Sequence, residues 1–585
     1  MSSKTTGSLL AAMAMLVVQP VFAKVIWVDQ KNGSDDWNGT CETWQGGKDG
    51  PKESFTNLTS YADGDTVYVK PGHYLISKQI EPNRHEISFI GVGSRDEIVL
   101  DGENARGIFY CESKTNCWFS NLTMVNAYGT GSNTGSSGSA IRTYGATGMT
   151  VSNCVFRHCR NESVSGGAVS LRGSGSTVID CVFTNCEALA GNAGALFFNG
   201  RASHLLRCRF EDCRAAAYGG AVSFTAKADY QAPWPVVEDC QFVSNRAVSA
   251  FAAYAGGGVF RRCTFVGNVA NYGGALGVRY SDVDDKATTV YCLDCQDCSF
   301  VGNRALQKGQ YDRAGGAAYL YGGDQAIMSN SFTRCVFTDN VATNGEGGAI
   351  WGGVWKVADC AFTGNRGTSG GAVYFGPYTP EKVCSFERSA FVGNVATNAN
   401  SDTYGGAIYG STMKNGLIRN CLFDGNTARR SGGALLLKYA QVESCTLVRN
   451  RSTQNGGAIL NDSNSDTVFV TNCVFMGNYS SDGDYRDLGN SNLGRSSGFC
   501  CFTDGFHFNK SYNIKTNDPM FVDYAAGDLR LDGKSACVNA GTNLSWMVGA
   551  TDLRGRRKYG RIADERVDIG CYEYWQPLGL LLMVR

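Results

Sequence analysis

One repeated unit dominates the sequence, and it restricts the available folds more than any other feature. The unit reads Cys-x-Phe-x-x-Asn and continues, after a few residues, with Gly-Gly-Ala and an aliphatic residue. Ser389 replaces the cysteine once and Leu447 replaces the aromatic once. Successive units lie 23 to 37 residues apart, a spacing typical of one solenoid coil with loops of unequal length. The cysteine of the unit is found at Cys154, Cys181, Cys208, Cys240, Cys263, Cys298, Cys335, Cys360, Cys421, Cys445 and Cys473.

The third landmark of the unit lies three residues beyond the aromatic. It is Cys159, Cys186 and Cys213 in the early units, and asparagine afterwards. Stacked asparagines are expected to form a side-chain ladder in which each amide donates to one neighbour and accepts from the other. Asparagine also tolerates the left-handed backbone of a bend, and the glycine pair permits a tight turn. The ladder is predicted at Asn245, Asn268, Asn303, Asn340, Asn365, Asn394, Asn426, Asn450 and Asn478.

These spacings predict an all-β fold. Residues at i and i+2 share one face of a strand, so the cysteine and the aromatic point the same way and form an apolar interior column. We therefore predict a right-handed parallel β-helix, a solenoid of about a dozen or more coils with N-terminal and C-terminal caps.

The residue just before each cysteine is predicted to face outward. From Asp180 to Arg388 it alternates between acid and base, coil by coil. Opposite charges on neighbouring strands stabilise the pairing by about 0.2–1 kcal/mol. We interpret this column as a device that sets the register and keeps the flank soluble. The column also gives a structural role to acidic residues that would otherwise resemble catalytic ones.

The 24 cysteines allow two interpretations. Coils about 4.8 Å apart are within reach of vertical disulfides, yet a small thiol suits a buried column without oxidation. We favour mostly free, buried thiols in the column. Cys537 and Cys571, outside the repeat, are the better candidates for a disulfide that closes the C-terminal segment.

The ends of the chain divide it further. Lys4, an apolar run and Val21-Phe22-Ala23 predict a signal peptide over residues 1–23. We expect an N-terminal cap and first coils over 24–110, repeats over 111–500, a C-terminal capping module over 501–575 and a short tail over 576–585. No transmembrane span is expected. The 53 basic and 53 acidic residues balance, which argues against a nucleic-acid partner.

The chain resembles two families of proteins. The Phe-x-x-Asn and Gly-Gly-Ala motifs of the unit resemble the repeats of chlamydial polymorphic outer membrane proteins. Examples are FVSN at 242–245 and FTGN at 362–365 for the first motif, and GGAV at 166–169 and GGAI at 347–350 for the second. That resemblance covers about residues 150–480 and implies a surface-displayed β-helix used in adhesion. Both ends resemble bacterial pectate-lyase-like β-helix proteins, through GDTVYVKPG at 64–72 and VDIGCYEY at 567–574. The latter motif is similar to the module that precedes surface-anchoring signals in many such proteins.

No catalytic or metal-binding constellation is predicted. Lyases on this fold need clustered acids for calcium and a basic residue, and hydrolases need paired carboxylates. Acidic pairs occur at Asp35-Asp36 and Asp284-Asp285, in loop-like sequence. The five histidines lack metal-ligand spacing, and we expect no cofactor. These histidines are His73, His85, His158, His204 and His507.

The sequence supports a binding surface better than it supports a catalytic site. The residue after the aliphatic of Gly-Gly-Ala should point outward, and in four consecutive coils it is Tyr319, Trp351, Tyr374 and Tyr409. These rings are predicted to form a platform for sugars or a partner protein. The alternative is an aromatic ladder that stabilises the sheet, or one covered by the loops 306–314 and 377–383.

The sequence therefore favours a secreted or cell-surface bacterial β-helix. We expect a monomeric, non-catalytic adhesin or glycan-binding solenoid whose partner is a polysaccharide, a host or cell-surface glycan or a protein. A polysaccharide lyase or glycoside hydrolase, and a purely structural envelope protein, are the alternatives.

Overall fold

A computed structural model gives the fold of the chain. It describes residues 23–56, 58–130, 139–162, 165–224, 234–249, 251–255, 257–279, 290–306, 313–321, 327–375, 384–398, 402–413, 415–463, 467–481, 487–489, 497–503, 512–555, 560–562 and 566–575. The predicted signal peptide, apart from Ala23, and the tail 576–585 lie outside the described residues.

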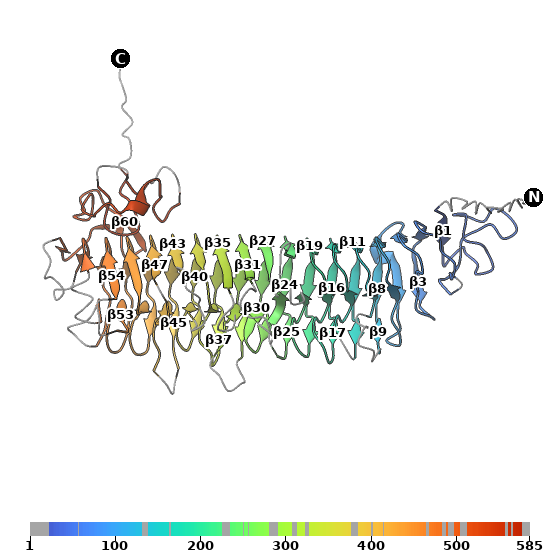
Figure 1. The fold of residues 1–585 in the computed structure, drawn as a ribbon, viewed down its shortest axis with the longest axis horizontal. Helices are drawn as coiled ribbons and strands as arrows, with labels where there is room; N and C mark the ends of the chain where they lie inside the picture. The colour runs from blue at the N-terminus through green and yellow to red at the C-terminus, as the bar shows by residue number, and fades with distance from the viewer. Residues whose placement is uncertain are drawn as a thin grey trace, which may run out of the picture.

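The chain forms the predicted parallel β-helix, a long rod of stacked coils (Figure 1). A typical coil contains four short strands: β11 (Thr150–Ser152), β12 (Val155–Arg157), β13 (Arg160–Asn161) and β14 (Val169–Leu171). Each strand pairs in parallel with its counterpart one coil later. Helix in the described part is limited to the 3-10 turns η1 (Arg95–Glu97) and η2 (Ser545–Met547). No described helix is long and apolar enough to cross a membrane.

The strands stack into four sheets along the rod. The described residues place 17 strands in the sheet that contains β11, 17 in that of β12, 11 in that of β13 and 13 in that of β14. The sheet of β14 carries the aromatic residues singled out above, and we call it the aromatic sheet. Its strands are β6 (Phe109–Glu112), β10 (Ile141–Tyr144), β14, β18 (Leu196–Phe198), β22 (Val222–Phe224), β26 (Phe251–Ala255), β30 (Gly273–Arg279), β34 (Ala318–Tyr321), β38 (Ile350–Gly352), β42 (Val373–Tyr374), β46 (Ile408–Gly410), β50 (Leu435–Leu437) and β53 (Ile459–Asn461).

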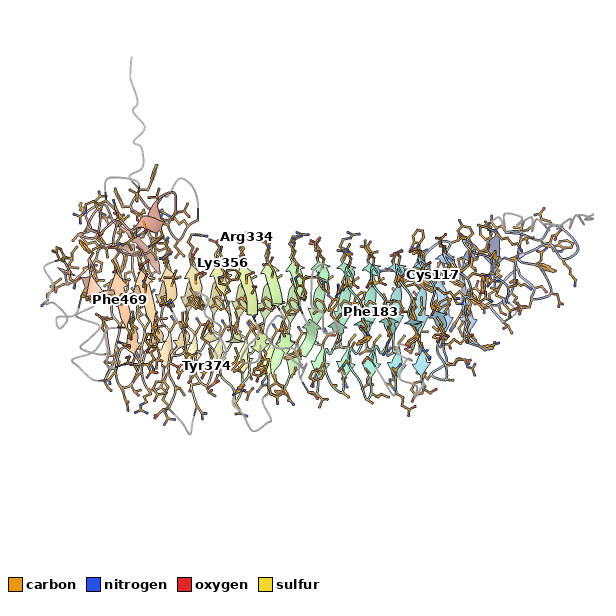
Figure 2. The ribbon with its side chains drawn as sticks, viewed as in Figure 1. Cys117, Phe183, Arg334, Lys356, Tyr374 and Phe469 are labelled. Carbon is orange, nitrogen blue, oxygen red and sulfur yellow. The ribbon has the colours of Figure 1, made fainter. Side chains whose placement is uncertain are left out.

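The repeated Cys-x-Phe residues form the core. Phe156 and Phe183 stack with centroids 4.6 Å apart, and Phe337 and Phe362 do the same. Figure 2 shows Phe183 between the two long edges of the rod and Arg334 at one of them. Every cysteine whose side chain is described is a free thiol, and all of these except Cys41 are buried. The column thiols donate to carbonyl oxygens, as Cys154 does to Ser152 at 3.2 Å.

The asparagines form a continuous buried ladder. The Asn340 amide donates to Asn365 Oδ1 at 3.0 Å and to the Phe300 carbonyl at 2.9 Å. The same Asn365 oxygen accepts the backbone N–H of Asn340. The ladder ends where Asn478 donates to Asp487 at 2.9 Å. One expectation was wrong: the left-handed residue of this bend is the one before the asparagine, such as Asp339 at φ 52°, because the asparagine begins the next straight segment.

The residues just before the cysteines lie in a corner and not on a strand face. Asp239 and Arg262 have φ of 55° and 52°, because the chain turns there from one sheet into the next. We call this series the corner column. Its acid–base alternation produces discrete bidentate pairs, in which the arginine of one coil binds the aspartate of the preceding coil. The pairs are Asp180–Arg207, Asp239–Arg262, Asp297–Arg334 and Asp359–Arg388, each with its shortest contact at 2.7 Å.

Described residues 512–575, which we call the C-terminal module, pack against the flank of the last coils (Figure 1). Strands β59 (Phe521–Asp523) and β60 (Asp528–Leu531) belong to it. Beneath it the outer face of the coils becomes apolar, since Leu422 and Val448 are buried against Leu529 and Cys571. Earlier in the same sheet, Val266 and Val336 are 40% and 42% exposed.

Candidate functional site

The four aromatic residues singled out in the sequence form one column on the outer face of the aromatic sheet. Strand pairing places Tyr319 beside Trp351, Trp351 beside Tyr374, and Tyr374 beside Tyr409. The three centroid distances are 4.7, 6.3 and 4.6 Å, and the rings are nearly parallel. We call these residues the aromatic column. In-register pairing produces this alignment directly, because each ring follows the same Gly-Gly-Ala-aliphatic segment.

The members of the column differ in exposure. Trp351 is 1% exposed and Tyr319 is 6% exposed, whereas Tyr374 and Tyr409 are partly exposed. Residues 307–312 of the first loop expected to cover the column, and all of the second loop at 377–383, lie outside the described residues.

A further aromatic ring extends the column at its N-terminal end. Phe251 stacks on Tyr319 with centroids 5.8 Å apart. The Phe251 ring occupies the space where a Cβ on Gly277 would lie, so it replaces the side chain that this glycine lacks. The sequence reasoning missed this ring because Phe251 does not follow a Gly-Gly-Ala segment.

Charged residues surround the buried end of the column. The indole N–H of Trp351 donates to a Glu346 carboxylate oxygen at 2.9 Å. The Arg313 guanidinium lies 6.0 Å from the Trp351 ring centre, within cation–π range. Burial, with Glu346 nearby, raises the pKa of the Tyr374 hydroxyl, and burial also raises the pKa of Tyr409. Both tyrosines are therefore uncharged at neutral pH.

The stacking limits what the column can contact. The rings cover one another's faces, so a ligand approaching from outside meets ring edges and hydroxyl groups. Face-to-face stacking of a sugar, as the platform idea requires, needs an uncovered ring face. The accessible part is the partly exposed pair Tyr374 and Tyr409, which we call the tyrosine edge.

The acids and histidines considered in the sequence are separated in the structure. Asp35 accepts hydrogen bonds from Ser54, and Asp284-Asp285 and His507 lie outside the described residues. His73 contacts Asp101 at 2.9 Å, and His85 contacts Thr115 at 3.0 Å. Among the described residues no group of three or more His, Cys, Asp or Glu could hold a metal ion.

The disulfide predicted between Cys537 and Cys571 is not present, and both residues are free thiols. Cys537 packs with Cys501 of the last coil, whereas Cys571 packs with Leu422 and Val448. The Cys537 carbonyl accepts the backbone N–H of Ile569 at 3.0 Å, so the two segments are adjacent, but the two thiols belong to different apolar clusters.

Comparison with known proteins supports the fold. Residues 103–276 match the family described as "Right handed beta helix region", and residues 420–438 match the "Chlamydia polymorphic membrane protein repeat". No curated protein matches the chain.

Solved structures are similar in fold alone. The Geobacillus virus E2 ORF18 structure is 12% identical over 52% of this chain and 56% of that chain, with a TM-score of 0.28. A tailspike protein of E. coli bacteriophage HK620, in complex with a pentasaccharide, is 11% identical over 74% of each chain, with a TM-score of 0.38. The alginate lyase AlyF-OU02 is 10% identical over 73% of this chain and 82% of that chain, with a TM-score of 0.31. By the two family matches, the chain contains a right-handed β-helix region and carries a segment similar to the Chlamydia polymorphic membrane protein repeat.

Proposed function

We propose that this protein is a non-catalytic, cell-surface β-helix that binds a glycan chain along the flank formed by the aromatic sheet. The observation that carries the proposal is the tyrosine edge: Tyr374 and Tyr409, partly exposed, uncharged and stacked 4.6 Å apart in adjacent coils. The match of residues 420–438 to the Chlamydia polymorphic membrane protein repeat supports a surface location.

The contact mode follows from the stacking. A tyrosine hydroxyl both donates and accepts hydrogen bonds, so it can pair with the hydroxyl groups of a sugar. Successive tyrosines are one coil apart, a spacing close to the rise of one sugar unit in an extended chain. A carboxylate, Glu346, lies beside the same edge and accepts hydrogen bonds. We therefore expect uncharged glycans to bind better than acidic ones.

Removal of the two hydroxyl groups tests the proposal. The double variant Tyr374→Phe/Tyr409→Phe retains the rings and their stacking, so the aromatic column and the fold should persist. Loss of two neutral hydrogen bonds should weaken binding about 10-fold. A glycan array probed with the full chain, followed by titration of the best neutral glycan, measures this change.

Tyr110→Phe is the matched control, because Tyr110 lies on the same sheet at its N-terminal end, where Arg142 covers its ring. Equal binding by the wild type and the double variant would exclude the tyrosine edge as the site. Release of shorter saccharides during incubation would contradict the non-catalytic part of the proposal.

A further inference from the structure

One contact between the C-terminal module and the coils brings two cysteines together. Cys501 lies on β57 (Cys501–Phe502), which pairs with β55 (Val474–Met476) of the preceding coil, and Cys537 lies in the module. The two residues belong to one apolar cluster, and both are fully buried. Each of them is a free thiol in the structure.

Cys501 lies outside the inner cysteine column. Its neighbour Cys500 continues that column, and the Cys500 thiol donates to the Val470 carbonyl at 3.6 Å. Successive side chains of an extended chain point to opposite faces, so Cys501 faces outward. In the preceding coils, from Val155 to Val474, this outer position never holds a cysteine. The chain therefore has a cysteine at this outer position only where Cys537 of the module packs on it.

The backbone holds both cysteines in place. The Cys501 N–H donates to the Cys473 carbonyl at 2.8 Å, in register with the preceding coil. The Cys537 carbonyl accepts the backbone N–H of Ile569 at 3.0 Å, which ties it to the end of the module. The two thiols therefore meet in one arrangement whenever the module is docked.

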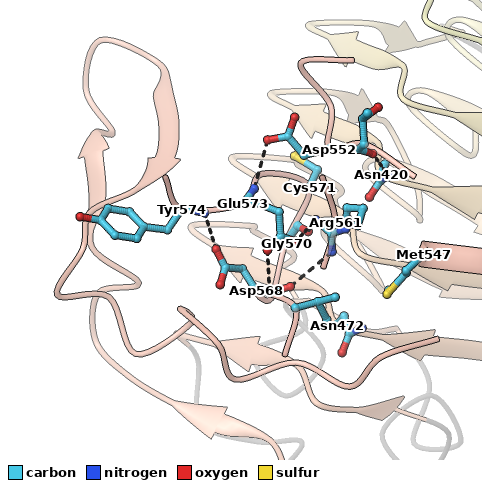
Figure 3. A network of polar contacts seen from close by, with 12 residues as sticks. Asn420, Asn472, Met547, Asp552, Arg561, Asp568, Gly570, Cys571, Glu573 and Tyr574 are labelled. Atoms are coloured by element: carbon cyan, nitrogen blue, oxygen red, sulfur yellow. Dashed lines mark hydrogen bonds and ion pairs between the residues drawn. The ribbon is translucent and has the colours of Figure 1, made fainter. Parts of the chain in front are cut away.

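The other cysteine of the module lies in a different environment. Cys571 belongs to a separate apolar cluster that contains no second cysteine among the described residues. Its backbone N–H donates to Thr446 Oγ1 at 3.1 Å, and Figure 3 shows it beside the polar network around Arg561. Cys501 is therefore the better partner for Cys537.

Docking of the module makes the two thiols unreactive. Hydrogen bonding to Cys537, together with burial, raises the pKa of the Cys501 thiol. The thiolate is the form that attacks a disulfide, so we expect the pair to react while the module is open. Asn420 helps to keep the module closed, because its side-chain N–H donates to the Thr551 carbonyl at 2.8 Å.

We propose that Cys501 and Cys537 form a disulfide that fastens the C-terminal module to the last coil. The thiolate of one cysteine attacks a disulfide-bearing oxidant, and the thiolate of the other then attacks the mixed disulfide. One S–S bond forms in the protein and the S–S bond of the oxidant breaks. The two protein thiols give up two electrons and two protons, and the oxidant leaves as two thiols.

The bond should persist outside the reducing cytosol. Disulfides are stable in oxidising compartments, to which the signal peptide predicted over residues 1–23 is expected to direct the chain. Closing the loop from 501 to 537 restricts the undocked state more than the docked one. The module should therefore open less often once the bond has formed.

Peptide mapping without reduction tests the proposal. The full chain is either exported to a bacterial periplasm or equilibrated with glutathione disulfide, and its free thiols are then blocked with N-ethylmaleimide in denaturant. Trypsin leaves Cys501 in peptide 496–510 and Cys537 in peptide 535–554. We expect most of the Cys537 peptide to be recovered linked to 496–510 and to separate on reduction. Cys501→Ser should abolish this linked pair.

Cys500→Ser is the matched control. Cys500 lies in the same tryptic peptide but belongs to the inner column, where Ser389 already replaces a cysteine once. This variant should leave the linked pair unchanged. Recovery of Cys537 wholly as the blocked thiol under both conditions would overturn the proposal, as would its linkage to Cys500 or Cys571.

Hydrogen exchange tests whether the bond fastens the module. Exchange of the Ile569 amide, which donates to the Cys537 carbonyl, should slow several-fold when the wild type is oxidised. Cys537→Ser treated in the same way should show no slowing. Equal exchange rates in the oxidised and reduced wild type would show that the bond does not hold the module closed.

Discussion

At the residue scale, the shape of each coil depends on the glycine pair that precedes the aromatic sheet. The first glycine of the pair is left-handed, as at Gly347 with φ 74°, a conformation that costs other residues about 1–2 kcal/mol. The second is needed for a different reason. A Cβ on Gly348 would lie 1.9 Å from the carbonyl oxygen of Gly371 in the next coil.

Gly348 and a left-handed glycine outside the pair, Gly393 of the segment FVGN at 391–394, should respond differently to alanine. Gly348→Ala must push two coils apart and should lower the free energy of unfolding by about 3 kcal/mol or more. Gly393→Ala, at φ 61° with nothing near the added Cβ, should cost only about 1–2 kcal/mol. Chemical denaturation of both variants measures the difference. Equal losses would show that the contact between coils adds no cost at Gly348.

At the scale of the elements, strands are joined by in-register stacking and by ion pairs at the corners. Strand β24 (Gln241–Val243) pairs residue by residue with β28 (Thr264–Val266). The adjacent corners hold Asp239 and Arg262 in a bidentate pair at 2.7 and 2.8 Å. Such pairs match one coil with its neighbour, since slippage by one residue would separate both charges from their partners.

The corner pairs should make the free energy of unfolding depend on pH. Hydrogen bonding to Arg262 lowers the pKa of Asp239 below its usual 3.8, and Arg334 does the same for Asp297. The stabilisation is therefore complete above pH 3.8 and is lost as pH falls through the lower pKa of the folded state. The double variant Asp239→Asn/Asp297→Asn removes both negative charges but keeps the shape of the side chains. Asparagine also tolerates the positive φ of these two corners.

This variant should be less stable than the wild type at pH 6, and the difference should shrink as the pH falls below 3.8. Thermal unfolding followed by circular dichroism at several pH values checks this trend. A difference that stays constant down to pH 2 would show that the ion pairs are not its source.

At the scale of the whole molecule, the C-terminal module depends on changes in the corner column. Where the acid–base alternation ends, Asn420 and Asn472 occupy the corners and bind the module. Asn472 donates to the Thr542 carbonyl at 2.8 Å and accepts the Thr542 backbone N–H at 2.9 Å. Its own backbone carbonyl accepts the N–H of Gly570 (Figure 3).

Asn472→Ala should loosen the module without unfolding the rod. Limited trypsin digestion should cut after Arg530 or Arg554 faster than in the wild type, while the stacked coils remain intact. Asn153→Ala is the control, because Asn153 has the same left-handed backbone but contacts Asn121 and Arg95. Equal cleavage in the two variants would exclude Asn472 as the anchor of the module.

Much of the repeat architecture could be predicted from spacing, but less of the candidate site. The i, i+2 relation of Cys335 and Phe337 places both in the core, and the spacing of the asparagines anticipates their ladder. The same rule correctly assigns Trp351 to the outer face. It does not predict how far the Trp351 ring is covered, because Glu346 contacts it from the preceding bend and Arg313 from the previous coil.

The sequence by itself determined the β-helix, its inner column and its ladder, because each depends on local periodicity repeated from coil to coil. Tertiary structure alone decided which aromatic rings remain accessible, which cysteines approach one another and where the C-terminal module lies. These features depend on contacts between residues that no fixed spacing connects. Trp546, for example, lies against Arg419 only because the chain returns to the flank of coils completed more than 100 residues earlier.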